Sequence, residues 1–157
     1  MKNPYVLTLR HTPAILERML DQIPAGRYAE FRHAERFNLI EAVSHLADWE
    51  SILLDRMQQT LEHPGSTVEA YDEGERAIAK QYATRDIRHE LSVFANRRRD
   101  TVSFLETLTP EQLALTSVHP ERGVMSIEDQ ANTMLGHDVY HLEHVSEYFA
   151  ELVEMVP

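Results

Sequence analysis

Apolar residues recur every three to four positions in four separate stretches of the chain, which is the spacing of an amphipathic helix. The first stretch covers residues 12–23, and residues 4–10 could add a turn before it. The other three stretches open at Asn38, near Thr84 or Asp86, and at Ser126. Because the glycines and prolines fall between the apolar stretches, the pattern favours helices over short strands.

Local signals mark the ends of these helices. Pro13 stands in the first helical position, where its missing N–H removes no hydrogen bond. Asn38 and Ser126 are each followed three residues later by an acidic residue, which is the spacing of a capping box. The third helix is expected to stop at Thr109-Pro110, because proline cannot continue a helix.

Each predicted helix has one apolar face that it cannot bury alone, so the helices are expected to pack as an all-α four-helix bundle. The inward positions of the last three helices are Leu39, Val43, Leu46, Leu53 and Met57, then Ile87, Leu91, Phe94, Val102 and Leu105, then Ile127, Ala131, Met134, Leu142, Val145, Phe149 and Leu152. The chain has 157 residues, 43% of them hydrophobic, which suits a single domain over residues 1–157 with a sizeable core.

The connections between the helices are long in two places. The connection over residues 60–83 is polar and could hold a short helix. When extended, about 20 residues span about 70 Å, whereas a helix of about 22 residues is only about 33 Å long. This crossover can therefore return along the whole bundle and leave the second and third helices parallel. The connection over residues 109–125 contains HPERG, which is typical of a tight turn.

The charge of the chain disfavours some partners. The sequence has 26 acidic and 15 basic side chains and a net charge of −11, so nucleic acid and anionic membrane surfaces are not expected to bind. No apolar run is long enough to span a membrane, and the N-terminus lacks the features of a signal peptide. The chain has no cysteine, hence no disulfide and no thiol of its own. The default expectation is a cytoplasmic protein.

The stretch GHDVYHLEHV places His137, His141 and His144 on one flank of the last helix, beside its apolar face. Nine histidines in the chain would give roughly half an HxxxH pair by chance, so a polar helix edge explains the motif equally well. One ion cannot easily bind all three rings, because His137 and His144 lie about 10 Å apart along the helix. A metal-binding pair would be His137/His141 or His141/His144.

His45 borders the apolar face of the second predicted helix. If the second and fourth helices are antiparallel, His45 lies about 21 Å from the C-terminal end of its helix. The His137/His141 pair lies about 20 Å from the N-terminal end of its own helix, so the two are level. Three imidazoles that leave further positions open to water would form a catalytic type of site for Zn²⁺ or a similar divalent ion.

The segments SHLADWE and HPERGVMSIEDQANTMLGHDVYHLEHV resemble the DinB/YfiT-like superfamily of metalloenzymes, and the likeness covers nearly the whole chain. The resemblance implies that His45, His137 and His141 bind the metal, and that His144, where many relatives carry glutamine, does not. It also implies up-down-down-up topology, Ni²⁺, Zn²⁺ or another divalent ion as cofactor, and frequent homodimers. Three aromatic residues near the last helix could contribute to a dimer interface: Tyr140, Tyr148 and Phe149.

Characterised relatives include thiol-dependent transferases and isomerases, so the resemblance implies a metal-dependent reaction on a small-molecule substrate. Because the chain has no cysteine, a low-molecular-weight thiol would have to be a cosubstrate. Thiol-dependent S-transfer and metal-assisted hydrolysis of a small amide or ester are the two enzymatic interpretations. The alternative is a non-catalytic metal-binding or stress-response bundle protein. The sequence identifies no catalytic acid or base.

Three further residues are candidates for a pocket beside the metal: Trp49, His119 and His144. Trp49 lies one turn from His45 and could serve both the core and the pocket, whereas the more ordinary role for His119 is that of a turn residue. Glu41 and Asp48 also flank His45, and both are expected to be exposed.

Three charged residues stand in the middle of apolar helix faces: Glu50, Arg98 and Asp138. A charge buried alone is costly, so Arg98 is expected to bridge Asp138, Glu50 or both inside the bundle. Because Asp138 adjoins His137, the network could also stiffen the metal-bearing helix as an outer shell. The competing interpretation is that these helix faces are rotated and the charged groups reach solvent.

Overall fold

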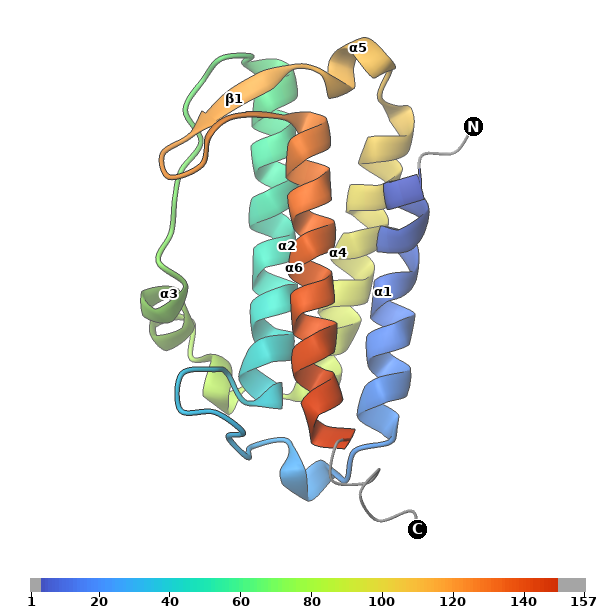
Figure 1. The fold of residues 1–157 in the computed structure, drawn as a ribbon, viewed down its shortest axis with the longest axis vertical. Coiled ribbons are helices and arrows are strands. Elements are labelled where there is room, and N and C mark those ends of the chain that lie inside the picture. Colours follow the sequence, from blue (N-terminus) through green and yellow to red (C-terminus); the bar gives the residue numbers. More distant parts are fainter. Residues whose placement is uncertain (1–3, 150–157) are drawn as a thin grey trace.

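The computed structural model describes residues 4–149 and contains the four expected long helices. They are α1 (Pro4–Asp21), α2 (Leu39–Glu62), α4 (Ile87–Thr107) and α6 (Ile127–Ser146). The connections hold two shorter helices, α3 (Glu73–Ala79) and α5 (Pro110–Leu113), and the strands β1 (Thr116–His119) and β2 (Gly123–Ser126). The prediction of a four-helix bundle is confirmed (Figure 1). Within the described residues, no helix has the length and apolarity needed to cross a membrane.

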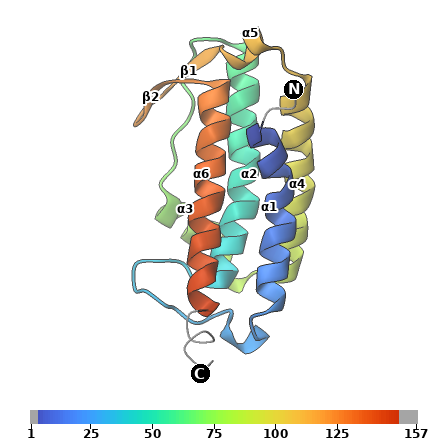
Figure 2. The same ribbon diagram turned by 45° about the vertical axis from the view of Figure 1, so that its right-hand side comes forward.

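Contacts between neighbouring helices fix their directions. α2 and α4 are parallel, because Ala47 and Glu50 of α2 contact Arg97 and Thr101 of α4 in the same order. α1 runs antiparallel to α4, and α6 runs antiparallel to α2. The parallel pair is possible because the connection from α2 passes through α3 along the side of the bundle before α4 begins (Figures 1 and 2).

The helix starts follow the capping signals of the sequence. Asn38 and Ser126 each accept a hydrogen bond from the main-chain N–H three residues later. Glu41 and Asp129 accept hydrogen bonds in return from the main-chain N–H groups of these caps, so both capping boxes are present. α4 begins after Asp86, which was one of the two expected starts.

The last helix is shorter than its apolar pattern suggested. α6 ends at Ser146, where the N–H of Glu147 donates to the carbonyl oxygen of His144 and tightens the chain. Phe149 therefore lies in a 3₁₀ turn after the helix. The predicted inward position Leu152 lies outside the described residues.

The first helix is longer than expected. α1 begins at Pro4 rather than at residue 12, so Pro13 lies inside the helix and not in its first turn. Proline leaves the carbonyl oxygen of the residue four positions earlier, Leu9, without its helical N–H partner. Arg98 of α4 donates from Nη1 to this carbonyl oxygen at 3.0 Å. A neighbouring helix thus satisfies the group that the proline leaves open.

The core contains two apolar clusters with a polar layer between them. One cluster surrounds Phe94, and the other surrounds Met134. Along α2, α4 and α6, the buried residues Glu50, Arg98 and Asp138 stand between members of the two clusters. The charged positions that interrupt the apolar faces therefore meet at one level of the bundle.

A β-hairpin, which the sequence did not predict, covers part of the crossover. β1 and β2 pair antiparallel around the HPERG turn, where Gly123 has a φ of 79°, a conformation that favours glycine. The main chain of Val118 bonds to that of Ser66 and Val68, at 2.9 and 3.0 Å. The hairpin and the crossover thereby form one wall beside α2 (Figure 1).

Candidate metal centre

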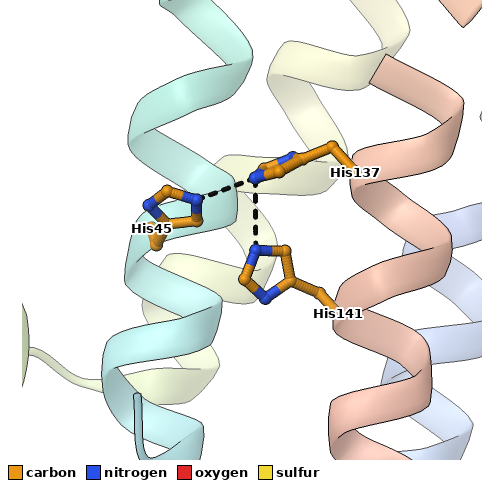
Figure 3. A group of neighbouring side chains, drawn as sticks. All are labelled: His45, His137 and His141. Carbon is orange, nitrogen blue, oxygen red and sulfur yellow. Dashed lines mark hydrogen bonds between the residues drawn. The ribbon is translucent and has the colours of Figure 1, made fainter. Parts of the chain in front are cut away.

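Three histidine rings converge between α2 and α6 (Figure 3). His45 Nε2 lies 2.7 Å from His137 Nε2, and His141 Nε2 lies 3.2 Å from that same atom. All three nitrogens lie within 4.8 Å of one another. α6 supplies two of the rings because His137 and His141 are about one helical turn apart, and the antiparallel packing of α2 brings His45 level with them.

Burial keeps the three rings neutral. Desolvation lowers the pKa of His45 to about 2, and repulsion from His137 adds to this effect. Desolvation also lowers the pKa of His137 to about 4 and the pKa of His141 well below its usual value. Each ring can therefore offer a lone pair at neutral pH, and this is the form of histidine that binds a metal ion.

The arrangement suits a cation better than it suits hydrogen bonds alone. A nitrogen of a neutral imidazole carries either a proton or one lone pair, so His137 Nε2 cannot pair well with both neighbours. The Nδ1 atoms of His45 and His141 are buried and have no hydrogen-bond partner. Nitrogen ligands placed tetrahedrally about 2.0–2.1 Å from zinc lie about 3.3 Å apart, close to the observed 2.7 and 3.2 Å. The three rings fit one divalent ion after small side-chain adjustments.

A buried ionic network lies beside this cluster. Arg98 donates from Nε and Nη2 to Glu50, at 2.8 and 2.7 Å, and from Nη1 and Nη2 to Asp138, at 2.5 and 2.9 Å. Burial alone would lower the pKa of Arg98, but the hydrogen bonds and charges of the two carboxylates outweigh it and the pKa is raised. The expected pairing is confirmed. Both oxygens of Asp138 accept hydrogen bonds from Arg98, and the stiffening of His137 by this network stays a prediction.

Asp48 is buried, so the expectation that it would be exposed was wrong. Its carboxylate accepts hydrogen bonds from Arg76 of α3 and, at 2.7 Å, from the hydroxyl of Tyr82. Burial would raise the pKa of Asp48, but the hydrogen bonds of Arg76 and Tyr82 and the charges of Arg76 and Lys80 lower it. These partners come from the crossover, which the helical pattern of α2 cannot reveal. Asp48 thus anchors the crossover one turn from His45.

A pocket opens beside the histidine cluster, with about 540 Å³ of empty space that is partly open to solvent. Its wall includes His137, and two of the three pocket candidates, Trp49 and His119, also line it. His144 does not line it; this residue is buried, with its ring centre 6.5 Å from that of His141.

The polar residues of the pocket wall that were not predicted include Arg56, Glu73, Arg122 and Gln130. They come from α2, α3, the hairpin turn and α6, so no single periodic pattern connects them. Burial raises the pKa of Glu73, and the charge of Arg122 opposes this effect. The one available signal was the HPERG motif, which contains both His119 and Arg122.

The aromatic residues near α6 differ in their exposure. Tyr148 is fully buried and donates its hydroxyl to the main-chain oxygen of Glu30 at 2.6 Å, so its predicted place at an interface was wrong. Phe149 is partly buried against the core. Tyr140 is 53% exposed and remains available for contact with another molecule.

The fold and the site together define a class of helical bundle in which histidines from two antiparallel helices meet beside a pocket. The chain matches the family model of the DinB superfamily over residues 8–145. It belongs to the DinB superfamily.

Several known proteins are similar to this chain. A protein of Oceanobacillus iheyensis named "Putative metal-dependent hydrolase" is 22% identical over 144 residues, which are 92% of this chain and 83% of that protein. YfiT from Bacillus subtilis, described as a probable metal-dependent hydrolase with an unusual four-helix bundle topology, matches with a TM-score of 0.88 and 20% identity, over 94% of this chain and 85% of YfiT. A mycothiol-dependent maleylpyruvate isomerase matches with a TM-score of 0.68 and 9% identity, over 90% of this chain but 57% of the isomerase. The likeness to the two solved structures is a likeness of fold.

Proposed function

We propose that this chain is a metal-dependent enzyme that acts on a small molecule, and that His45, His137 and His141 hold one divalent ion such as Zn²⁺ or Ni²⁺. The observation that carries this proposal is the convergence of three neutral imidazoles beside a pocket whose wall includes His137. Three protein ligands leave coordination positions free for a reactant, as in catalytic metal sites.

A bound divalent ion would supply Lewis acidity, which activates a water or a thiol near neutral pH. His137 is the least buried of the three histidines and brings the cluster to the pocket wall. Glu73 is the one carboxylate among the described residues of that wall; its side chain is exposed, and the desolvation that it does undergo raises its pKa. We assign Glu73 the role of moving the proton.

The first candidate reaction is hydrolysis of a small amide or ester. In amide hydrolysis the oxygen of water bonds to the acyl carbon, the C–N bond breaks, and the products are a carboxylate and an ammonium. Glu73 would accept a proton from the water and deliver it to the leaving nitrogen. The name of the Oceanobacillus relative supports this candidate.

Thiol-dependent S-transfer is the second candidate. The likeness in fold to a mycothiol-dependent isomerase favours it, and the chain has no cysteine, so the thiol would be a low-molecular-weight cosubstrate. A bundle that binds metal without turnover is the non-catalytic alternative.

Metal content tests the histidine assignment. The protein, purified without an affinity tag, is expected to contain about one divalent ion per chain by elemental mass spectrometry. His141→Ala is expected to lose this ion, because two imidazoles hold it more weakly than three. His144→Ala is the matched control, since it removes a buried histidine of the same helix that lies outside the cluster. Full metal occupancy in His141→Ala would reject the site.

A screen of small amides, esters and electrophiles, each with and without added thiol, separates the candidate reactions. Turnover that needs the metal alone supports hydrolysis, and turnover that needs both metal and thiol supports S-transfer. Stoichiometric metal with no turnover on any substrate supports the non-catalytic alternative.

We also propose that the chain forms a homodimer, which is supported by the exposed Val139 and Tyr140 on α6. Light scattering at micromolar concentration is expected to give twice the chain mass of 18.2 kDa. A mass near that of one chain would reject the dimer.

A further inference from the structure

Two arginines, Arg56 and Arg122, line the pocket beside the histidine cluster. Arg56 lies on α2, with its guanidinium carbon 5.7 Å from the centre of the Trp49 ring. Arg122 lies in the turn between β1 and β2. Burial lowers the pKa of Arg56, and the charge of Arg122 lowers it further. The two positive groups are therefore close enough to repel each other.

Neither guanidinium is paired with a carboxylate. Arg56 donates from Nε and Nη2 to the main-chain oxygen of Glu69, at 3.1 and 2.6 Å. Within residues 4–149, no carboxylate oxygen lies within 4.0 Å of Arg56 or Arg122. Arg56 is half-buried and Arg122 is exposed. Arg36, Arg76, Arg85 and Arg98 each have a carboxylate partner, whereas the half-buried Arg97 has none among the described residues and donates to the main-chain oxygen of Ala47. In a chain with 26 acidic side chains, unpaired positive charge on a pocket wall points to an anionic occupant.

Nearby acidic groups limit the charge of that occupant. Glu73 lines the same wall. The charge of Arg122 lowers the pKa of Arg56, whereas three nearby acidic groups raise it: Tyr71, Glu121 and Glu69. Among the residues that line the wall, two guanidinium groups and the single carboxylate of Glu73 leave an excess of about one positive charge, which a carboxylate neutralises and a dianionic phosphate exceeds.

The remaining residues of the wall indicate which chemical groups the bound molecule should have besides its negative charge. Apolar contacts come from Leu53, Val68 and Met125. Gln130 uses its amide nitrogen to bond the Thr60 hydroxyl at 2.9 Å, and its carbonyl oxygen has no partner. Trp49 Nε1 also has no partner. Neither atom is exposed to solvent, so a group in the pocket would reach them only after a small side-chain shift; an amide group offers both the donor that Gln130 lacks and the acceptor that Trp49 lacks.

We propose that Arg56 and Arg122 form an anion subsite, which holds the carboxylate of a small amide with an apolar side chain while the amide lies toward His137. N-acyl amino acids have this chemistry. The inference rests on the proposed function, because it names the substrate class of that same site.

Trp49 is the only tryptophan of the chain and lines the pocket, so its fluorescence reports binding directly. The probes are three acid and amide pairs of equal size: the N-acetyl derivatives of leucine, methionine and phenylalanine and their carboxamides. For at least one pair, the acid is expected to bind about tenfold or more tightly than the amide, since each hydrogen bond to a charged group is worth about a factor of ten. The preference should weaken as salt is added.

Arg122→Gln is the decisive variant, because Arg122 has no hydrogen bond to any other described residue and its loss should leave the fold intact. It is expected to reduce the preference for the acid to about threefold or less, as is Arg56→Gln. Arg99→Gln on the exposed face of α4 is the control, since it removes the same charge outside the pocket and should keep the full preference. Glu73→Gln should tighten binding of the acid.

The same titrations on metal-depleted protein separate this inference from the proposed function. The two arginines do not belong to the histidine cluster, so the acid preference should persist without metal and even where no turnover is found. Equal binding of acid and amide in every pair, no fluorescence response to any acid, or a preference unchanged in Arg122→Gln would overturn the anion subsite. Metal-dependent turnover confined to the carboxamides would leave the proposed function standing and reject the inferred substrate class.

Discussion

Replacing Arg98 with methionine tests whether the buried ionic layer stabilises the bundle. The guanidinium uses all five of its N–H donors, four on Glu50 and Asp138 and one on the carbonyl oxygen of Leu9. Arg98 is 1% exposed, and Glu50 and Asp138 are 2% and 1% exposed, so water cannot replace the lost partners. Methionine is flexible and can fill much of the vacated space, so the substitution mainly removes the charge and its hydrogen bonds.

The expected loss follows from two estimates. Each hydrogen bond to a charged group contributes about 1.5–3 kcal/mol, so four of them would sum to at least about 6 kcal/mol. This sum overestimates the loss, because the methionine variant avoids the free-energy cost of desolvating a guanidinium on folding. Removing one partner of a buried ion pair costs about 3–5 kcal/mol, and we expect Arg98→Met to lower the free energy of unfolding by this amount. Such a loss is a large fraction of the total of about 5–15 kcal/mol for an ordinary domain.

Urea unfolding followed by the helical circular dichroism signal measures this loss. The matched control is Arg99→Met, which changes the exposed neighbour on the same helix and should alter stability by less than about 0.5 kcal/mol. Adding Glu50→Met and Asp138→Leu to Arg98→Met should restore most of the stability, because no carboxylate is then left buried without a partner. The reasoning is refuted if Arg98→Met is as stable as Arg99→Met.

Two further substitutions test the crossover. Glu73→Gln is expected to lower the turnover number by about 100-fold or more while the metal content stays unchanged, and undiminished turnover would remove Glu73 from the reaction. Asp48→Asn is expected to destabilise the fold by about 1–3 kcal/mol at pH 7, through its contacts with Arg76 and Tyr82. Because the folded-state pKa of Asp48 is lowered, its contribution is present above the unfolded pKa of about 4 and is lost as the pH falls. The urea midpoints of parent and variant should therefore converge below about pH 4, and a gap that stays constant would contradict this account.

Local rules predict a helix boundary only when the groups that decide it are close in sequence. At Asn38 and Ser126, the capping partner lies three residues away, so the whole signal is present in a short window. At Pro13 the same reasoning fails, because the group that satisfies the freed Leu9 carbonyl is Arg98, 89 positions along the chain. The start of α1 therefore depends on tertiary packing.

The histidine cluster could be predicted in part from local helical patterns, whereas the pocket beside it depends on tertiary packing. His45, His137 and His141 lie on long amphipathic helices, whose faces and relative heights follow from the periodicity of the sequence. Periodicity left His137/His141 and His141/His144 open as the metal-binding pair, and only the resemblance to the DinB/YfiT-like superfamily favoured the first. The pocket also needs Glu73 and Arg122, whose positions depend on the path of the crossover and the hairpin. Strands of four residues are too short for their alternation to be told from a loop, so these side chains could not be placed from the sequence pattern.

The ionic layer and the histidine cluster share α2 and α6, which suggests why the bundle keeps charges in its core. Asp138 and His137 are adjacent on α6, so their side chains point about 100° apart around the helix. Asp138 meets Arg98 of α4, while His137 meets His45 of α2. Sliding α6 by one residue would break both sets of contacts, whereas apolar side chains can repack after such a shift more readily.

Stability and metal binding are expected to separate in the variant that replaces Glu50, Arg98 and Asp138 together by apolar residues. We expect it to be about as stable as the parent, because an apolar core of similar volume can replace a buried ion pair. We expect it to bind Zn²⁺ about 10–100-fold more weakly, because nothing then fixes the register of α6 against α2 as tightly as the paired charges do. The two quantities are measured on the same protein, by urea unfolding of the metal-free form and by competition with a chelator. Parent-like zinc affinity in a stable variant would mean that the ionic layer serves the fold alone and plays no part in holding His137.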